Sequence, residues 1–160
     1  MKKLDLLLAL CICLLACATL HAQQLTVQTD VGKQVLSRTD IEALPHVKVT
    51  ASEHSSGPIA FEGVTVKSVL EKAGVSFGES LKGKRLSSCL LVEAADGYQV
   101  VIALPELDSA FTDKQTLLVF SRDGKPLVDK EGPYRIVIPD EKRMARWVRQ
   151  VTTLKIVSVQ

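Results

Sequence analysis

The sequence predicts an α+β domain that is mainly β, with mixed sheets and a few short helices. Strand-like apolar segments recur along the chain, and most of them are joined by tight turns. The clearest turn is Ala95-Asp96-Gly97, which lies between two apolar runs and is a strong β-hairpin signal. Helical patterns are few and short. Because strands joined by tight turns pair antiparallel, we expect most strand pairs to be antiparallel.

The N-terminal part of the domain combines a hairpin with a short helix. Residues 25–29 alternate as a strand does, and Gly32-Lys33 has the composition of a turn that leads into a strand over residues 34–36. Thr39 and Glu42 have the spacing of a capping box, so we expect a short helix that Pro45 ends.

A second helix is predicted farther along the chain. A strand over residues 47–50 precedes a polar, turn-rich loop over residues 52–58. Thr65 has the character of an N-cap, and Gly74 stands where a helix commonly ends. The residues between them form an apolar helix face, made of Val66, Val69, Leu70 and Ala73.

The C-terminal half is predicted to be mostly strands, at residues 86–94, 98–104, 116–121, 134–138 and 151–159. Pro105 opens a helical turn that reaches Leu107. Asp140 is predicted to cap a short helix that carries Lys142, Arg143 and Arg146.

The first 22 residues have the pattern of an export signal, with Lys2 and Lys3 before a short apolar run and Ala22 at the cleavage position. We therefore expect a signal peptide at residues 1–22, one domain at residues 23–160, and a periplasmic or secreted protein. Leu14-Leu15-Ala16-Cys17 resembles a lipobox, so lipidation at Cys17 is the alternative and the one route to a membrane.

The composition of residues 23–160 narrows the class of protein. These 138 residues hold 18 basic and 17 acidic side chains, and this balance argues against a nucleic-acid partner. Cys89 is their single cysteine, so the domain has no internal disulfide and depends on its apolar core. Free thiols in apolar strands usually serve packing, and we expect the same of Cys89.

Basic residues gather around the single tryptophan, Trp147. Arginines bind anions with two parallel hydrogen bonds, and side chains three residues apart on a helix share one face. The cluster therefore predicts a site for an anionic ligand, and it comprises Arg135, Lys142, Arg143, Arg146 and Arg149. The alternative is a solvated basic face that pairs with Asp140 and Glu141.

The polar loop over residues 52–58 supplies two further candidates, Ser52 and His54. Loops carried on a rigid sheet commonly hold site residues. The spacing of a metal site is absent from this loop, so the alternative is an exposed histidine.

Several of these segments, in this order, resemble the molybdopterin-binding domain of the sulfite oxidase family. The segments are Phe61-Glu62-Gly63-Val64 with the helix after it, Asp123-Gly124-Lys125-Pro126-Leu127, Gly132-Pro133-Tyr134-Arg135, and Arg146-Trp147-Val148. The resemblance implies a mostly β fold that holds a pyranopterin, with Arg135 and Arg146 as contacts of the cofactor or another anion. We add Arg143, His54 and Ser52 to this candidate binding set.

The sequence departs from the family at the metal. The family ligates molybdenum through a cysteine upstream of the segment at Phe61, and residues 49–57 contain none. Glu131 stands where the family has a histidine. A thiolate suits a high-valent molybdenum centre better than Ser52 or Glu53 would.

Three functions remain open on the sequence alone. The first is a molybdopterin-dependent oxidoreductase. The second is a domain that has lost the metal and binds a pterin-like or other anionic small molecule in its basic pocket. The third is a non-catalytic accessory module that contacts a periplasmic protein partner. The missing cysteine favours the second and third.

Overall fold

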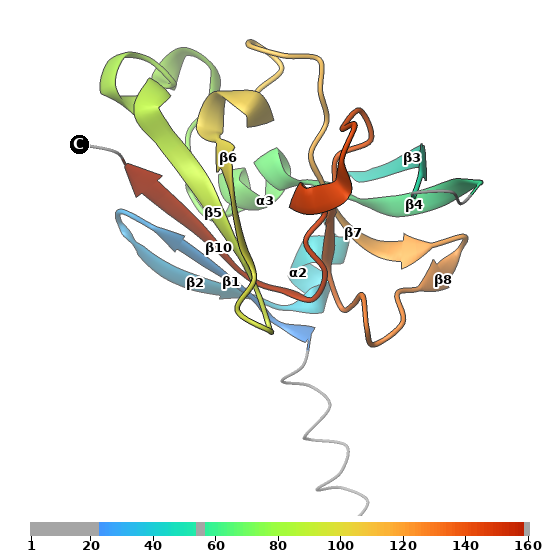
Figure 1. Ribbon diagram of the computed structural model, residues 1–160. Coiled ribbons are helices and arrows are strands. Elements are labelled where there is room, and N and C mark those ends of the chain that lie inside the picture. Colours follow the sequence, from blue (N-terminus) through green and yellow to red (C-terminus); the bar gives the residue numbers. More distant parts are fainter. Residues whose placement is uncertain (1–22, 54–56, 159–160) are drawn as a thin grey trace, which may run out of the picture.

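The computed structural model describes residues 23–53 and 57–158, which form two sheets that enclose a common core (Figure 1). Sheet A has the strand order β2 (Gly32–Leu36), β1 (Leu25–Thr29), β10 (Val151–Ser158), β5 (Ser88–Ala94), β6 (Gln99–Ala103). Sheet B has the order β3 (His46–Ser52), β4 (Pro58–Thr65), β7 (Leu117–Arg122), β8 (Lys125–Pro126), and β9 (Arg135–Val137) also pairs with β7.

The described strand pairs are antiparallel except for β1 with β10. The helices are short: α2 (Arg38–Glu42), α3 (Val66–Lys72), and the 3₁₀ turns η2 (Gly78–Ser80), η3 (Gly83–Ser87), η4 (Leu104–Leu107) and η5 (Met144–Arg146). This arrangement confirms the prediction of a mainly β α+β domain with short helices. The predicted signal peptide and Cys17 lie outside the described residues.

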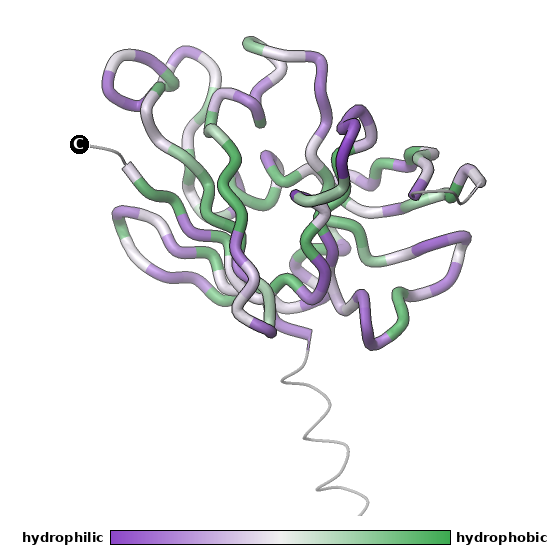
Figure 2. The backbone as a smooth tube through the Cα atoms, viewed as in Figure 1, coloured by the Kyte–Doolittle hydropathy of each residue, from purple (hydrophilic) through white to green (hydrophobic). Residues whose placement is uncertain are grey.

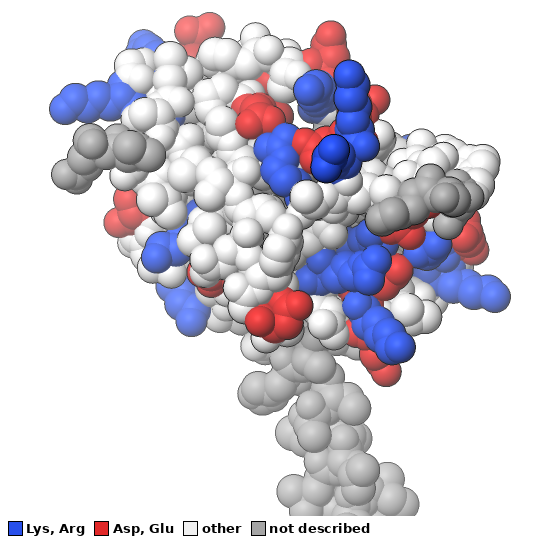
Figure 3. All heavy atoms as spheres, in the orientation of Figure 1, with Lys and Arg blue, Asp and Glu red and all other residues white. Residues whose placement is uncertain are grey.

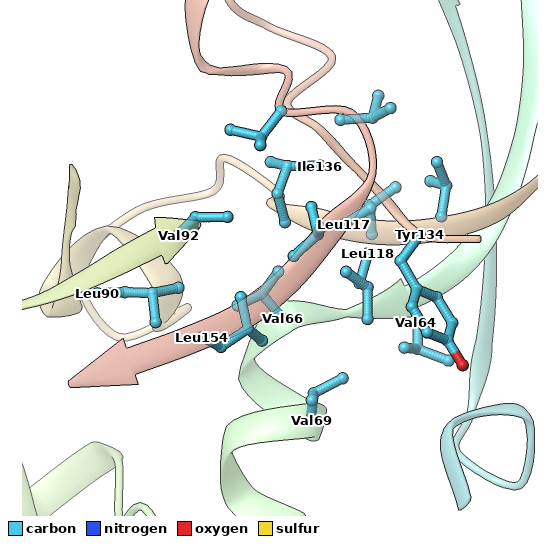
Figure 4. Close-up of a cluster of buried hydrophobic side chains, with 14 of the residues drawn as sticks. Val64, Val66, Val69, Leu90, Val92, Leu117, Leu118, Tyr134, Ile136 and Leu154 are labelled. Carbon is cyan, nitrogen blue, oxygen red and sulfur yellow. The ribbon is translucent and has the colours of Figure 1, made fainter. Parts of the chain in front are cut away.

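The core lies between the two sheets and the helix α3 (Figure 4). Leu90 and Leu154 of sheet A, Val69 of α3, and Leu117 of sheet B are all fully buried. The alternation of buried and less buried residues along β5 shows that one face of this strand enters the core while the other faces outward.

The first hairpin turn and the N-cap of α2 both lie two residues before their predicted positions. The first hairpin turns at Asp30 and Val31, and Gly32 already belongs to β2. The predicted cap at Thr39 was wrong, because Ser37 caps α2: its hydroxyl accepts from the Asp40 amide while the Asp40 carboxylate accepts from the Ser37 amide. This reciprocal pair forms a capping box two residues before the predicted one.

The helix α3 begins and ends as predicted. The Thr65 hydroxyl accepts a hydrogen bond from the Ser68 amide at 3.1 Å, and Gly74 adopts a φ of +89° after the last turn. Just before this helix, a Cβ on Gly63 would lie 2.2 Å from the Leu118 carbonyl oxygen. Glycine is therefore required at this position of β4, because the backbone of β7 leaves no room for a side chain.

Candidate functional site

Arg135, the first residue of β9, is the one buried member of the predicted basic cluster. Only 1% of its surface is exposed. Its guanidinium lies 5.8 Å from the Phe61 ring centroid and 5.5 Å from that of Trp147, both within the range of a cation–π contact. A strand that is otherwise apolar thus carries a full positive charge into the core.

Two carboxylates neutralise this charge, one from a distant part of the chain and one four residues before Arg135. The Nη2 of Arg135 donates to Glu53 Oε1, and its Nη1 lies 3.3 Å from Glu131 Oε1. Arg122 of β7 joins the same group, because its Nη1 lies 2.9 Å from Glu53 Oε2 and 3.0 Å from Glu131 Oε1. Two arginines and two glutamates therefore form a neutral cluster, which we call the Arg135 cluster.

The Arg135 cluster also sets the ionisation of Glu53. Burial by itself would raise the pKa of this carboxyl, but the hydrogen bond and charge of Arg135, together with those of Arg122, outweigh it. The pKa of Glu53 therefore lies below its ordinary value of 4.5. At neutral pH the carboxylate is ionised and both of its oxygens are bound to arginine.

The Arg135 cluster lies beneath a pocket of about 250 Å³. Much of its lining comes from the turn joining β5 to β6 and from the segment around η5, which are different parts of the chain. Its lining includes Glu53, Asp96, Tyr98, Arg135, Trp147 and Arg149. Three side-chain atoms of the cluster are buried without a hydrogen-bond partner: Glu131 Oε2, Arg135 Nε and Arg135 Nη1.

Arg146 belongs to a different group from Arg135. Its Nε donates to Glu141 Oε1 at 2.8 Å, and its Nη2 lies 3.4 Å from Glu106 Oε2. The hydrogen bond that Arg146 donates to Glu141 raises the pKa of Arg146, and burial opposes this shift only partly. We call these three residues the Arg146 cluster; its arginine does not line the 250 Å³ pocket.

The segment that carries Lys142, Arg143 and Arg146 does not form the predicted helix. The turn η5 is a three-residue 3₁₀ helix, and its N-cap is Arg143 with no side-chain capping bond. The predicted cap at Asp140 was therefore wrong. Arg143 is exposed and precedes η5, so it shares no helix face with Arg146. Basic and acidic groups lie intermixed on this side of the molecule (Figure 3).

The lining of the 250 Å³ pocket includes neither Ser52 nor Cys89. Ser52 is exposed at the end of β3, paired with Pro58 of β4. His54 lies outside the described residues. Cys89 is partly buried on β5, in the other sheet, and is a free thiol.

The donor groups at this site do not suit a molybdenum centre. Residues 49–53, which the resemblance aligns with the region of the metal ligand, contribute Glu53 to the pocket, and its oxygens already bind two arginines. A high-valent molybdenum centre favours a soft thiolate over such a carboxylate. Across the described ranges, no group of three histidine, cysteine or acidic side chains is arranged to hold a metal.

A larger pocket of about 570 Å³ lies on another part of the surface. Its polar lining groups include Arg38, Asp129 and Gln150, which are engaged within the chain: Arg38 pairs with Glu42, and the Gln150 amide donates to the Asp129 carbonyl. Of these two pockets of the described residues, the one beside Arg135 carries a buried charge and unpartnered polar atoms.

The two-sheet fold, with a buried arginine on β9 beside a tryptophan-lined pocket, defines an α+β domain of the molybdopterin-binding type. The chain belongs to the oxidoreductase molybdopterin-binding domain family, whose model matches residues 15–160. This confirms the resemblance seen in the sequence, and it is a family that binds molybdopterin.

Solved structures share the fold, and one of them shows how far the similarity extends. The crystal structure of the sulfane dehydrogenase SoxCD from Paracoccus pantotrophus superposes with a TM-score of 0.64 at 19% identity. The match covers 84% of this chain but 38% of that chain. No curated protein matches the chain by sequence. Among the described residues, no helix is both long and apolar enough to cross a membrane.

Sequence reasoning found Arg135 but missed its environment. Glu53 and Glu131 were recognised only as departures from the family, and Arg122 was not assigned to the site, whereas Arg149 of the predicted cluster does line the pocket. One signal was available: an arginine inside an apolar strand needs a buried counterion, and glutamates at departing positions are candidates for that role.

Proposed function

We propose that this protein is a metal-free binding domain that takes a small anionic ligand in the pocket beside Arg135. In this proposal it acts outside the cytoplasm, as the predicted export signal implies. Its activity is recognition rather than oxidation or reduction.

The observation that carries the proposal is the ion pair between Glu53 and Arg135. The resemblance assigns Arg135 to a cofactor or another anion, but here a carboxylate of the chain already binds it. A pocket of about 250 Å³ also lies below the ~300–1,000 Å³ usual for drug-sized ligands. These two facts favour a ligand smaller than a pterin cofactor.

Arg149 is the cation best placed to bind such a ligand. It lines the pocket and is exposed, and the described residues offer it no carboxylate within ion-pair distance. Tyr98, which is 49% exposed, lines the same pocket and donates its hydroxyl to the Ala145 carbonyl at 2.7 Å. A ligand that carries a carboxylate or phosphate beside a small apolar group fits this combination.

The proposal that the protein binds no metal is tested by measuring the molybdenum and pterin content of the purified protein. The full chain is expressed in a host that assembles molybdenum cofactor, and the purified protein is assayed for molybdenum and for the fluorescent oxidation product of the pterin. We expect far less than one equivalent of each. A stoichiometric amount of both would contradict the proposal.

The anion part is tested by titration with inorganic phosphate and sulfate, monitored by backbone amide chemical shifts. We expect shifts centred on Tyr98 and Trp147, and Arg149→Ala should weaken phosphate binding about tenfold, because a charged hydrogen bond is lost. Arg85→Ala is the matched control, since Arg85 is exposed on η3 and does not line the pocket. Equal losses in the two variants would mean that the anion binds nonspecifically.

A second candidate function is a protein-interaction module. A specific feature favours it: the free edge of sheet A at β6 is uncharged.

A further inference from the structure

The strand β6 ends sheet A and leaves one side of its backbone unpaired. The Ala94 amide donates to the Tyr98 carbonyl at 2.9 Å at the start of the hairpin, and the pairing continues without a bulge to Cys89 with Ala103. Because bonding direction alternates along an antiparallel strand, the amide and carbonyl groups of Gln99 and Val101 point away from β5. They form an open hydrogen-bonding edge.

The strand β6 itself lacks the blocking residues that the other edge strands carry, although the residues that flank it, Tyr98 and Glu106, bond to Ala145 and Arg146 of the turn η5. Natural edge strands commonly contain lysine, proline or a bulge that blocks pairing with another chain. The strand β2 contains Lys33, β3 contains Lys48, and β8 consists of Lys125 and Pro126. The strand β6, with the sequence Gln-Val-Val-Ile-Ala, has no charge and no proline.

The outward face of β6 is apolar as well. Val101 is 53% exposed, and its neighbour across the hairpin is Leu91, which is partly buried on the same outer face. The hydropathy view shows the hairpin of β5 and β6 as a largely apolar ribbon at this border of the sheet (Figure 2). Exposed apolar groups beside an open edge are typical of a strand-pairing surface.

We propose that β6 pairs with β6 of a second copy of this chain, antiparallel and about a two-fold axis at Val101. The two sheets A then become one continuous sheet across the interface. Val101 lies opposite Val101 of the second copy, and the two residues exchange a pair of backbone hydrogen bonds.

The pattern of β6 favours a second copy over another occupant. In this register Val100 lies opposite Ile102 of the second copy, so the inward apolar row of each sheet continues into the other. Gln99 lies opposite Ala103, whose outward amide already donates to Glu106 Oε1 in its own chain, so the Ala103 carbonyl is the group left to accept from Gln99. No two like charges meet within the paired strands, because β6 contains none. The strand is thus complementary to itself, as a two-fold interface requires.

The test is the oligomeric state of the full chain, measured by sedimentation equilibrium. We expect a reversible dimer with a micromolar dissociation constant, because a short strand pair forms a small interface. Val101→Lys places two lysines opposite each other and should raise this constant by at least about 100-fold. Val101→Glu should do the same, and an equimolar mixture of the two variants should form heterodimers because the charges now attract.

The matched control is Val35→Lys on β2, at the opposite edge of sheet A. Val35 is 51% exposed and its register places it on the same outer face as Val101, so this change adds the same charge without touching β6. It should leave the dimer intact.

A wild-type chain that stays monomeric up to about 100 µM overturns the proposal. A dimer that Val101→Lys leaves unchanged, with circular dichroism showing the fold intact, overturns it equally. Phosphate binding in the pocket is measured separately, so either proposal can fail without the other.

Discussion

Arg135 and Arg146 make the same kind of contact in different surroundings. Each arginine pairs with two glutamates. The side chain of Arg135 is 2% exposed and packs between aromatic rings, whereas that of Arg146 is 29% exposed at the surface. The sequence assigned both to one anion site, yet burial gives them different physical roles.

Burial decides how much each ion pair contributes to the free energy of unfolding. An exposed pair is screened by water and salt and commonly stabilises a protein by about 0–1 kcal/mol. A buried pair contributes little net stability when it is complete, but removing one partner leaves an uncompensated charge in the core and costs about 3–5 kcal/mol. The Arg135 cluster should therefore be required for folding, and the Arg146 cluster should be dispensable.

Arg135→Met has the largest expected effect. The change keeps much of the side-chain volume but leaves Glu53 buried beside Arg122 alone. We expect the free energy of unfolding, measured with urea, to fall by about 3–5 kcal/mol. Arg149→Met is the control, because Arg149 is exposed, and it should change stability by less than about 1 kcal/mol. Similar losses in both variants would contradict the distinction between buried and exposed arginines.

Glu53→Gln should have a smaller effect than Arg135→Met. The amide keeps the shape of the side chain and can still accept a hydrogen bond, and Arg135 retains Glu131 as a counterion. We expect a loss of about 1–3 kcal/mol in the same urea experiment. Glu141→Gln makes the same change in the Arg146 cluster and should cost clearly less. If Glu141→Gln costs as much, burial does not distinguish the clusters.

Much of the fold could be predicted from the sequence because its signals are local. The cap at Thr65, the stop at Gly74 and the Asp96-Gly97 turn each act within a few residues, and α3 and the β5–β6 hairpin lie where predicted. The misplaced cap of α2 also has a local cause, because two nearby residues compete for the N-cap position. Ser37 and Thr39 both suit an N-cap, and the reciprocal bond with Asp40 selects Ser37.

The site could be predicted only in part because one partner of each arginine is distant in sequence, although Glu131 and Glu141 lie only four and five positions from Arg135 and Arg146. Arg135 and Glu53 are 82 positions apart, and the fold alone brings them together. The five basic residues looked like a single anion pocket since their neighbours in sequence contain few acids. Folding instead supplies Glu53 to Arg135 and Glu106 to Arg146.

The Arg135 cluster also predicts a dependence on pH. The pKa of Glu53 lies below 4.5 in the folded protein, so the unfolded chain takes up a proton first as the pH falls. The contribution of this carboxylate to the free energy of unfolding is fully present above pH 4.5. It is lost as the pH falls through the pKa of Glu53 in the folded protein. The stability difference between the wild type and Glu53→Gln should therefore shrink in acid. Urea unfolding at a series of pH values measures this, and a difference that stays constant would contradict the ion-pair role.

Arg146→Ala should have the smallest effect, and it sharpens the comparison most directly. The variant removes an arginine with two carboxylate partners, as Arg135→Met does, but at a site where water replaces the lost contacts. We expect a loss of about 0–1 kcal/mol that diminishes as salt is added, because exposed charges are screened. The loss for Arg135→Met should persist in salt, since its partners are buried. A loss of about 3 kcal/mol for Arg146→Ala would show that Glu106 and Glu141 behave as buried charges, and the two clusters would then be equivalent.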